Sequence, residues 1–312
     1  MKVRNNIPVY KISWLRYADG GTIGTYYEPE NREELLNLCK HLYKEGKTFD
    51  IIGHTSNIYY LPSYSIDILV STRKVNETIE DEDYIIADCG VSVSSLAKQM
   101  VKKGIKGFEG LIDLPGTVAA SVYGNASCYG CSINALMTSC TLLQPNGEVL
   151  TIRPQDLRLQ KRSSALKRKE LKGVILTVTL KKEKGDAEQL ATLAEQNHLR
   201  RKVTQPGSKD NLGSIYAVSD GWSLYSVIPR MITAIYGLLI GLTDKDKESL
   251  KLRKKAFIFR LLGAKDLLPY VFGWNRYIWK DAQSHELFWK FHRLHQKMFK
   301  KSVFEIEIKG KR

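Results

Sequence analysis

The stretch of the chain that most limits its fold is LPGTVAASVYGNASCYGC, residues 114–131. It gathers small residues behind a Pro-Gly turn, and small residues are needed where another group must approach the backbone closely. That group can be a phosphate-bearing cofactor, a metal ion or a neighbouring strand. The fold must therefore place this segment in a tight turn beside one of these three.

A metal ion is the least favoured of the three. Cys128 and Cys131 form a CxxC motif, but a zinc site needs four ligands, and no second CxxC or histidine pair follows at suitable spacing. A redox disulfide would need a thioredoxin-like strand and helix around the motif. His285, His292 and His295 fit one packed or solvated helix face. We expect no metal, and we interpret the two cysteines as small turn residues.

A second glycine turn, GHTSN at residues 53–57, follows an apolar strand. Glycine at its start permits backbone angles that expose successive N–H groups, and such a nest binds anions. The three polar residues after His54 add further donors. Two such turns in one α/β region fit a dinucleotide held between two lobes. No GxGxxG motif follows a strand, so a Rossmann site is not expected.

The first 200 residues show a mixed α/β pattern with short connections. We expect helices at 31–46, 93–104 and 186–202, strands at 64–71, 84–90 and 173–180, and a hairpin over 140–152. Asn31 can cap the first helix, and Asn146-Gly147 suits the hairpin turn. The tail FEIEIKGKR alternates like a strand, with Glu305 and Glu307 on one face.

Charge is divided unevenly along the 312 residues. Residues 1–150 hold 14 Lys/Arg and 17 Asp/Glu, whereas residues 151–312 hold 34 and 16, a net charge of +18. A basic half favours an anionic partner: a phosphorylated substrate, a membrane surface or nucleic acid. No nucleic-acid-binding motif accompanies the basic run at 159–172, so nucleic acid is not expected.

The last third contains an apolar run of 13 residues, 231–243, which is too short to span a bilayer. A buried helix or strand pair is the first interpretation. Docking on a membrane surface is the alternative, because the basic and apolar segment 251–265 follows. The N-terminus shows no export signal, so we expect the five cysteines to be reduced and the protein to be cytoplasmic.

The order and spacing of these segments resemble the UDP-N-acetylenolpyruvoylglucosamine reductase family, flavoenzymes of the vanillyl-alcohol-oxidase fold group. The family's GGGSN-Leu-Leu turn is similar to IIGHTSNIYYLP, and its Gly-Ile-Pro-Gly-Thr-Val-Gly-Gly-Ala segment is similar to DLPGTVAASVYGNASCYGCSI. The resemblance covers about residues 20–217 and the last dozen residues. It implies an α+β, PCMH-type FAD-binding fold in two lobes, followed by a divergent α/β substrate domain.

The implied domain boundaries are 1–70 for lobe 1, 71–200 for lobe 2, 201–300 for the substrate domain and 301–312 for a strand that returns to the active site. The FAD-binding residues implied by the resemblance are Gly53, His54, Thr55, Ser56, Asn57, Pro115, Gly116, Thr117, Ala120, Asn125, Ala126, Tyr129 and Gly130. His54 and Thr55 replace two glycines of the family turn, and these changes are small enough to keep FAD.

The resemblance also implies three catalytic residues. Arg162 in KRSSALK takes the place of the family's catalytic arginine, Ser214 in NLGSIYAVS that of its proton donor, and Glu307 in FEIEI that of its glutamate. The implied reaction uses NADPH or NADH to reduce FAD. FAD then reduces an enolpyruvyl ether on an anionic nucleotide sugar to a lactyl ether.

The implied role is peptidoglycan or surface-polysaccharide synthesis in the cytoplasm. The basic and apolar segment 251–265 adds an expected peripheral contact with the inner membrane face. Two alternatives stay open, because the third domain departs from the family pattern. One is a FAD-linked oxidase or dehydrogenase of the same fold with another substrate. The other is a non-catalytic, membrane-associated protein that has kept the flavin fold.

Overall fold

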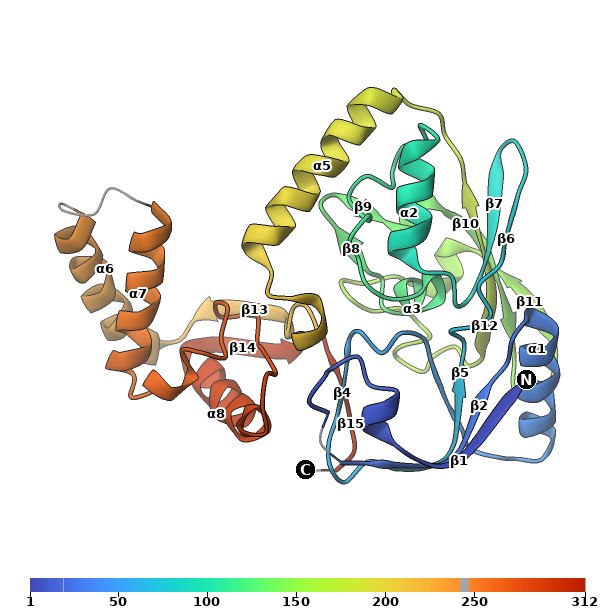
Figure 1. Ribbon diagram of the computed structural model, residues 1–312, viewed down its shortest axis with the longest axis horizontal. Helices are drawn as coiled ribbons and strands as arrows, with labels where there is room; N and C mark the ends of the chain where they lie inside the picture. Colours follow the sequence, from blue (N-terminus) through green and yellow to red (C-terminus); the bar gives the residue numbers. More distant parts are fainter. Residues whose placement is uncertain (19, 242–246, 312) are drawn as a thin grey trace.

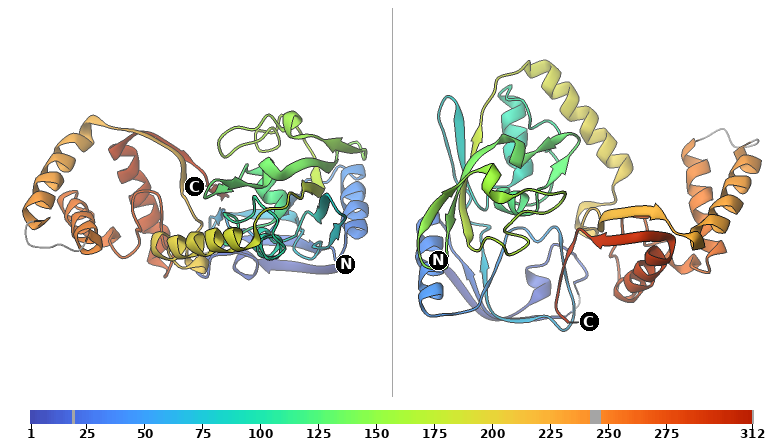
Figure 2. Two further views of the ribbon diagram at one scale, coloured as in Figure 1. Left: turned by 90° about the horizontal axis from the view of Figure 1, so that it is seen from above. Right: turned by 180° about the vertical axis from the view of Figure 1, so that it is seen from behind.

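The computed structural model describes residues 1–18, 20–241 and 247–311 (Figure 1). Two lobes, each built on its own sheet, lie side by side. A third unit of helices and a two-stranded ribbon extends away from them, as the further views in Figure 2 also show. The expected α+β class with two lobes and a smaller following unit is confirmed.

Lobe 1 is built on a four-stranded sheet with the order β1-β2-β5-β3. β2 and β3 run parallel to β5, and β1 pairs antiparallel with β2. The elements are β1 (Lys2–Pro8), β2 (Thr22–Glu28), α1 (Arg32–Lys44), β3 (Asp50–Ile52), β4 (Ile58–Tyr60) and β5 (Ser65–Ser71). Helix α1 begins where expected, because the Asn31 side chain accepts a hydrogen bond from the Glu34 N–H.

Lobe 2 is built on a five-stranded antiparallel sheet with the order β11-β10-β12-β7-β6. The strands are β6 (Thr78–Glu80), β7 (Tyr84–Asp88), β10 (Met137–Leu143), β11 (Val149–Ile152) and β12 (Val174–Lys181). Between them lie α2 (Val93–Lys102), α3 (Val118–Tyr123), the small hairpin β8 (Ser127–Cys128) and β9 (Cys131–Ser132), and α4 (Ile133–Leu136). The predicted strands and the hairpin at Asn146-Gly147 are all present.

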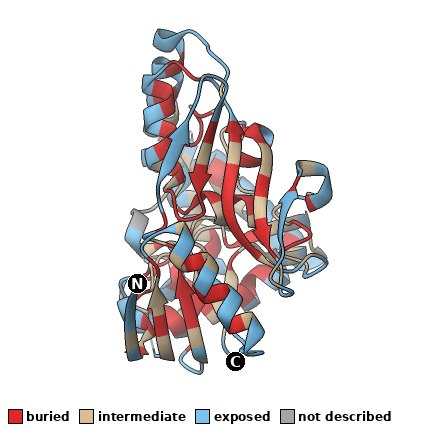
Figure 3. Cartoon of the chain, turned by 90° about the vertical axis from the view of Figure 1, so that its right-hand side faces the viewer, coloured by how far each residue is buried: buried red, intermediate tan, exposed pale blue. Residues whose placement is uncertain are grey.

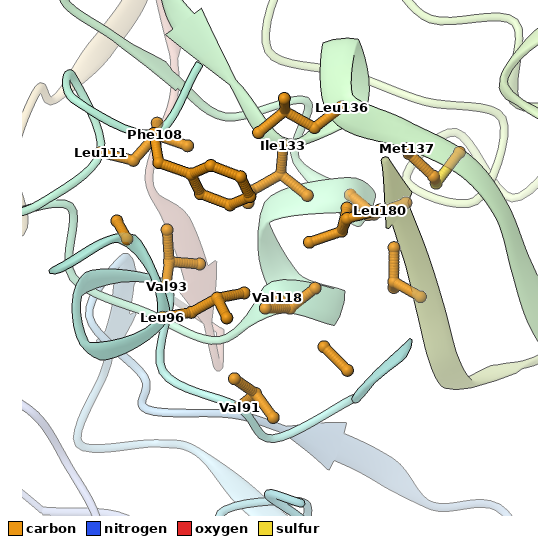
Figure 4. Close-up of a cluster of buried hydrophobic side chains, with 14 of the residues drawn as sticks. Val91, Val93, Leu96, Phe108, Leu111, Val118, Ile133, Leu136, Met137 and Leu180 are labelled. Carbon is orange, nitrogen blue, oxygen red and sulfur yellow. The ribbon is translucent and has the colours of Figure 1, made fainter. Parts of the chain in front are cut away.

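The core of lobe 2 is aliphatic. Phe108 is the one aromatic ring among its fully buried members, and it packs among Val93, Leu111 and Ile133 (Figure 4). Viewed from the side, the buried residues of the lobes concentrate along the strands, and the helices turn an exposed face outward (Figure 3). A sheet with one covered face produces this pattern.

The third unit begins after α5 (Ala187–Thr204), the long helix that leads out of lobe 2. It contains β13 (Tyr216–Trp222), α6 (Val227–Gly241), α7 (Lys247–Leu261), α8 (Gln283–Met298) and β14 (Phe299–Phe304), with β13 and β14 paired antiparallel. The last strand, β15 (Glu307–Lys309), returns to lobe 1 and pairs parallel with β4. Short 3₁₀ turns occur at Val9–Lys11, Pro154–Leu157, Ser208–Asp210, Leu224–Ser226 and Lys265–Leu267.

The first interpretation of the 231–243 run, a buried helix or strand pair, is wrong for the described part of the run. Residues 231–241 belong to α6, and Gly237 is the one residue of α6 that is buried. Residues Leu224–Gly241 also form the one described segment long and apolar enough to cross a membrane, by length and composition alone. Residues 242 and 243 lie outside the described residues. An apolar stripe shows only that a helix has an apolar face, and not whether the chain covers it.

Candidate functional site

A cavity of about 780 Å³ lies where the two lobes and the end of the chain meet. Its walls come from the segments around residues 47–58, 114–128, 162–175, 201–214 and 305–309. Cavities of roughly 300–1,000 Å³ are typical of small-molecule and cofactor sites. The cavity therefore has the size of a ligand site and draws on segments far apart in the sequence.

The turn at residues 53–57 forms one wall, and Arg73 holds its backbone. Arg73 donates hydrogen bonds to the carbonyl oxygens of Gly53 (3.1 Å) and His54 (3.3 Å), and also to that of Ile12 (2.6 Å). Thr55 has a φ of 58°, a left-handed angle unusual for a side-chain-bearing residue. The Arg73 contacts fix the turn with two of its carbonyl groups directed at the guanidinium.

The N–H groups of this turn are available to a ligand. Within the described residues, the N–H groups of His54, Thr55 and Ser56 donate no hydrogen bond, although all three residues line the cavity. Burial, and to a smaller extent the charge of Arg73, lower the pKa of His54, which favours its neutral form. Successive unpaired N–H groups at a turn with a left-handed residue make a nest that binds anions.

The second small-residue turn contacts the first. A methyl group added to Gly53 would lie 2.6 Å from the Thr117 Oγ1, and one added to Gly116 would lie 3.3 Å from the Ser56 Oγ. Gly116 also has a φ of 117°, which favours glycine. The glycines at 53 and 116 thus let the two turns close on each other, and together they form one continuous wall of the cavity.

Ten of the thirteen residues expected to bind FAD line this cavity. They are Gly53, His54, Thr55, Ser56, Asn57, Pro115, Gly116, Thr117, Ala120 and Ala126. The other three, Asn125, Tyr129 and Gly130, do not line it.

Asn125 donates to the Gln160 carbonyl oxygen (2.7 Å) and so supports the loop that carries Arg162. Gly130, with a φ of 83°, forms the turn of the β8–β9 hairpin, and the Tyr129 ring lies under the Arg200 guanidinium. Loop and turn geometry therefore explains the residue types at 125 and 130.

All three residues expected to be catalytic line the cavity. Arg162 lies in a tight turn with a φ of 56°, and its Nη2 donates to the Ser127 carbonyl oxygen (3.1 Å). Ser214 follows Gly213, whose φ is 77°. The N–H of Glu307 donates to the Asn57 carbonyl oxygen (2.9 Å), which anchors Glu307 directly to the first glycine turn.

The acidic partner of Arg162 is Glu305, a residue that the sequence analysis did not select for a site role. The Arg162 Nε lies 3.2 Å from the Glu305 Oε1, and both side chains are largely buried. Burial raises the pKa of Glu305, and Arg162 opposes that rise. The sequence predicted Glu305 and Glu307 on one face of a single strand, whereas Glu305 lies in the bend between β14 and β15, and only Glu307 belongs to the strand that returns to lobe 1.

The cavity carries an excess of positive charge. Its lining includes six Lys or Arg residues and three Asp or Glu residues; the basic ones are Lys47, Arg162, Lys167, Lys172, Arg201 and Lys309. Side-chain guanidinium and ammonium groups are the usual partners of phosphate and carboxylate. The walls therefore suit ligands that carry several negative charges.

The two cysteines of the CxxC motif form no disulfide. They occupy opposite backbone positions in the β8–β9 hairpin. The Cys131 Sγ accepts a hydrogen bond from the Gly110 N–H (3.3 Å), and Cys128 lines the cavity. Among the described residues, no group of three or more His, Cys, Asp or Glu side chains could hold a metal ion. The histidines of α8 pack instead: His285 contacts the Tyr59 hydroxyl (2.8 Å), and His295 stacks on Tyr216.

Comparison with known proteins agrees with this geometry. Residues 24–153 match the family model described as "FAD binding domain". The matched residues span most of the first lobe and the first part of the second, so the part of the two-lobed α+β fold that carries both glycine turns resembles an FAD-binding domain.

The sequence is also similar to curated proteins that share one enzyme name. The UDP-N-acetylenolpyruvoylglucosamine reductase of Caldanaerobacter subterraneus is 27% identical over 203 residues, which are 65% of this chain and 67% of that protein. The enzyme of the same name from Bacillus pumilus is 26% identical over 69% of this chain and 70% of its own length. These matches span about two thirds of either protein.

A solved structure extends the fold comparison to the whole chain. The UDP-N-acetylenolpyruvylglucosamine reductase (MurB) from Thermus caldophilus superposes with a TM-score of 0.66 over 99% of both chains, at 18% identity. The chain is therefore similar in sequence to UDP-N-acetylenolpyruvoylglucosamine reductases over about two thirds of its length, and similar in fold to this solved reductase from end to end.

Proposed function

We propose that this protein is a FAD-dependent, NAD(P)H-using reductase that converts an enolpyruvyl ether on a UDP-sugar into a lactyl ether for peptidoglycan or surface-polysaccharide synthesis. One observation carries the proposal: Arg162, Ser214 and Glu307, separated by up to 145 positions, line one cavity together with both glycine turns. Relatives with that reductase name support the substrate class.

The residues present fit FAD. The unpaired N–H groups of His54, Thr55 and Ser56 would hold its pyrophosphate, and Gly53 and Gly116 keep side chains out of the space between the two turns. Asn125, Tyr129 and Gly130 would act indirectly, by shaping the loops next to the cavity. When bound, FAD supplies a hydride, taken from NADPH or NADH, to the terminal carbon of the enolpyruvyl double bond.

The Arg162 guanidinium would bind the enolpyruvyl carboxylate. Hydride addition pushes negative charge onto that carboxylate, and a donor already directed at the developing charge lowers the barrier most. The Glu305 carboxyl at 3.2 Å and the Ser127 carbonyl oxygen at 3.1 Å hold the guanidinium in place. Glu307, on the same wall, would be a further polar group at the reacting end.

Ser214 would donate its hydroxyl proton to the carbon next to the carboxylate and complete the lactyl ether. A serine hydroxyl is a weak acid, so this role needs a strongly basic reaction intermediate, which a charged enediolate provides. The backbone helps to hold Ser214, because the carbonyl oxygen of the next residue, Ile215, accepts a hydrogen bond from the Glu305 N–H (2.8 Å). The proton donor and the partner of Arg162 are therefore tied together by main-chain contacts.

The visible absorption spectrum tests the proposal. Purified protein should show a flavin band that bleaches on anaerobic addition of NADPH and returns when the enolpyruvyl ether of UDP-N-acetylglucosamine is added. A colourless protein that takes up no added FAD would contradict the enzyme assignment. A band that returns with oxygen but with no enolpyruvyl sugar would instead favour an oxidase of the same fold.

We also propose that the protein works in the cytoplasm, where nucleotide sugars are made, and contacts the inner membrane face peripherally. The membrane contact is supported by the apolar residues that α6 leaves exposed in the basic half of the chain. Fractionation of cells that express the full chain tests the location. Recovery of the protein outside the cell would contradict it.

A further inference from the structure

Helix α6 carries an apolar face that no other described element covers. Ile228, Met231, Ile232, Ile235, Leu238 and Leu239 follow the spacing of one helix face, and all six are exposed, Leu238 to 74% and Ile228 to 68%. Leu224 in the preceding turn is 89% exposed. A contiguous apolar surface of this kind marks a contact site for a protein or a membrane.

The opposite face of α6 is already used in packing. Tyr236 stacks on Phe257 of α7 with ring centroids 4.0 Å apart, and the Lys254 side chain lies across Gly237. Helix α6 therefore has two distinct faces. One packs against α7, and the exposed apolar face is separate from it. The α6–α7 pair lies at the end of the molecule farthest from the lobes (Figure 1).

The segment next to this face is strongly basic. Residues 251–265 contain six Lys or Arg residues and no Asp or Glu. Lys251, Arg253, Arg260 and Lys265 are exposed. Lys255 is half-buried and donates to the Val271 carbonyl oxygen (3.2 Å). An apolar helix face beside a basic helix complements an anionic lipid surface, where acyl chains receive the first and phosphate groups the second.

We propose that the α6–α7 pair docks this protein on an anionic phospholipid bilayer, with α6 lying in the plane of the interface. The exposed α6 residues would enter the boundary between headgroups and acyl chains. The basic side chains of α7 would contact lipid phosphates. The inference rests on the peripheral membrane contact proposed above and names its surface and lipid class. It does not rest on the proposed reductase activity, since this surface is separate from the cavity.

An in-plane position fits better than a spanning one. The segment Leu224–Gly241 is long enough to cross a bilayer by composition, but Arg230 lies within it, and its guanidinium sits over the Trp222 ring at 4.1 Å. Helix α6 also packs along α7, so insertion across the bilayer would carry basic side chains of α7 into hydrocarbon. A helix lying on the surface keeps those charges in the headgroup layer.

A second copy of this chain is a less favourable partner for the exposed α6 face than a lipid surface. Two α6 faces packed against each other would bring two α7 helices close together, and each α7 carries six positive residues and one negative residue. Like charges at short range oppose such a contact. The positive charges of α7 would attract an anionic surface, whereas they would repel each other in a self-contact.

Vesicle flotation with the full-length protein tests the proposal. Wild-type protein should float with vesicles of equal parts phosphatidylglycerol and phosphatidylcholine, and remain unbound with phosphatidylcholine alone. The double variant Ile235→Asp/Leu239→Asp should weaken binding by at least about tenfold, because each charge must stay in water. Both residues are more than half exposed, so the variant should keep the wild-type thermal midpoint.

A matched control comes from α5. Leu199 and Val203 have the same spacing and similar exposure, 51% and 71%, but lie on a different helix, so Leu199→Asp/Val203→Asp should leave vesicle binding unchanged. Three results would overturn the proposal. They are no binding of the wild type to the anionic vesicles, equal binding by the α6 variant, and retention of the wild type in membranes after alkaline extraction. A wild-type dimer that the α6 variant splits, without vesicle binding, would assign the face to a second copy.

Discussion

Lobe 2 and the third unit bury different kinds of side chain. The main core of lobe 2 is almost entirely aliphatic, with Phe108 as its one fully buried ring. The core of the third unit is aromatic and takes in Tyr59 from β4 of lobe 1. The ring of Tyr59 and those of Tyr277, Trp279 and Phe288 form contacts at centroid distances of 4.9–5.4 Å. The lobe supplies a wall of small residues to the cavity, whereas the third unit is held by large rings.

The difference gives each region its own optical probe. All five tryptophans of the chain, Trp14, Trp222, Trp274, Trp279 and Trp289, lie in or against the third-unit core. The fluorescence of FAD bound in the cavity would follow the unfolding of the lobes. Tryptophan fluorescence and flavin fluorescence can therefore follow the two regions separately in one sample.

The largest expected effect is on the free energy of unfolding, when one aromatic ring is removed from either core. Phe288→Ala should destabilise the third unit by about 3–5 kcal/mol, because a fully buried ring leaves a cavity behind. Phe108→Ala should destabilise lobe 2 by a similar amount. Urea unfolding should show Phe288→Ala lowering the tryptophan midpoint more than the flavin midpoint, and Phe108→Ala the reverse. If both variants shift the two midpoints equally, the regions unfold as one unit and the comparison fails.

The second effect concerns chemistry at the cavity. Arg162→Lys should lower kcat/KM by about 10²–10³, because lysine keeps the charge but loses the planar donors directed at the carboxylate. Flavin content and the rate of bleaching by NADPH should stay unchanged, since Arg162 is placed at the substrate. Stopped-flow absorbance separates the two half-reactions. Slower bleaching in this variant would move Arg162 to the cofactor side of the site.

The sequence predicted the lobes well because their determinants are local. Asn31 caps α1 through its own first turn, and Asn146-Gly147 forms the expected hairpin. The two glycine turns were recognised from short-range composition. The contact between them, Gly53 against Thr117, joins positions 64 residues apart and could be seen only in the structure.

The site and the third unit depended more on tertiary contacts. Glu305 and Glu307 are equivalent by alternation, so the sequence could not tell which carboxyl would meet Arg162. Arg73 had no motif around it, because it acts through backbone carbonyl groups that any residue provides. The outward direction of the α6 face was only the alternative interpretation of the 231–243 run, since periodicity does not reveal what covers a face.

The third effect is acid sensitivity of the third unit. His295 is fully buried, with both ring nitrogens near the hydroxyls of Ser219 (3.3 Å) and Ser302 (2.8 Å), and burial lowers its pKa to about 3. Below about pH 6.5 His295 is protonated in the unfolded chain, whereas in the folded chain it stays neutral until about pH 3. Stability should therefore fall with falling pH in that window, by up to about 1.4 kcal/mol per pH unit.

The urea midpoint from tryptophan fluorescence, measured between pH 7 and pH 4, checks this expectation. His295→Gln, which keeps a donor and an acceptor, should flatten the tryptophan profile while leaving the flavin profile as in the wild type. A wild-type tryptophan midpoint that does not change with pH would show that His295 is not the acid-sensitive group of the third unit.

The smallest expected effect concerns the first glycine turn. Arg73→Lys should weaken FAD binding by about fivefold, or about 1 kcal/mol, because an ammonium group cannot contact the Gly53, His54 and Ile12 carbonyl oxygens together. Titration of the apoprotein with FAD measures the change. Lys74→Gln, at the exposed neighbouring position, is the control and should bind FAD as the wild type does. Equal affinity in Arg73→Lys would mean that the turn keeps its shape without the guanidinium, through the Thr55 hydrogen bond to the Ile12 carbonyl oxygen and the packing of Gly53 against Thr117.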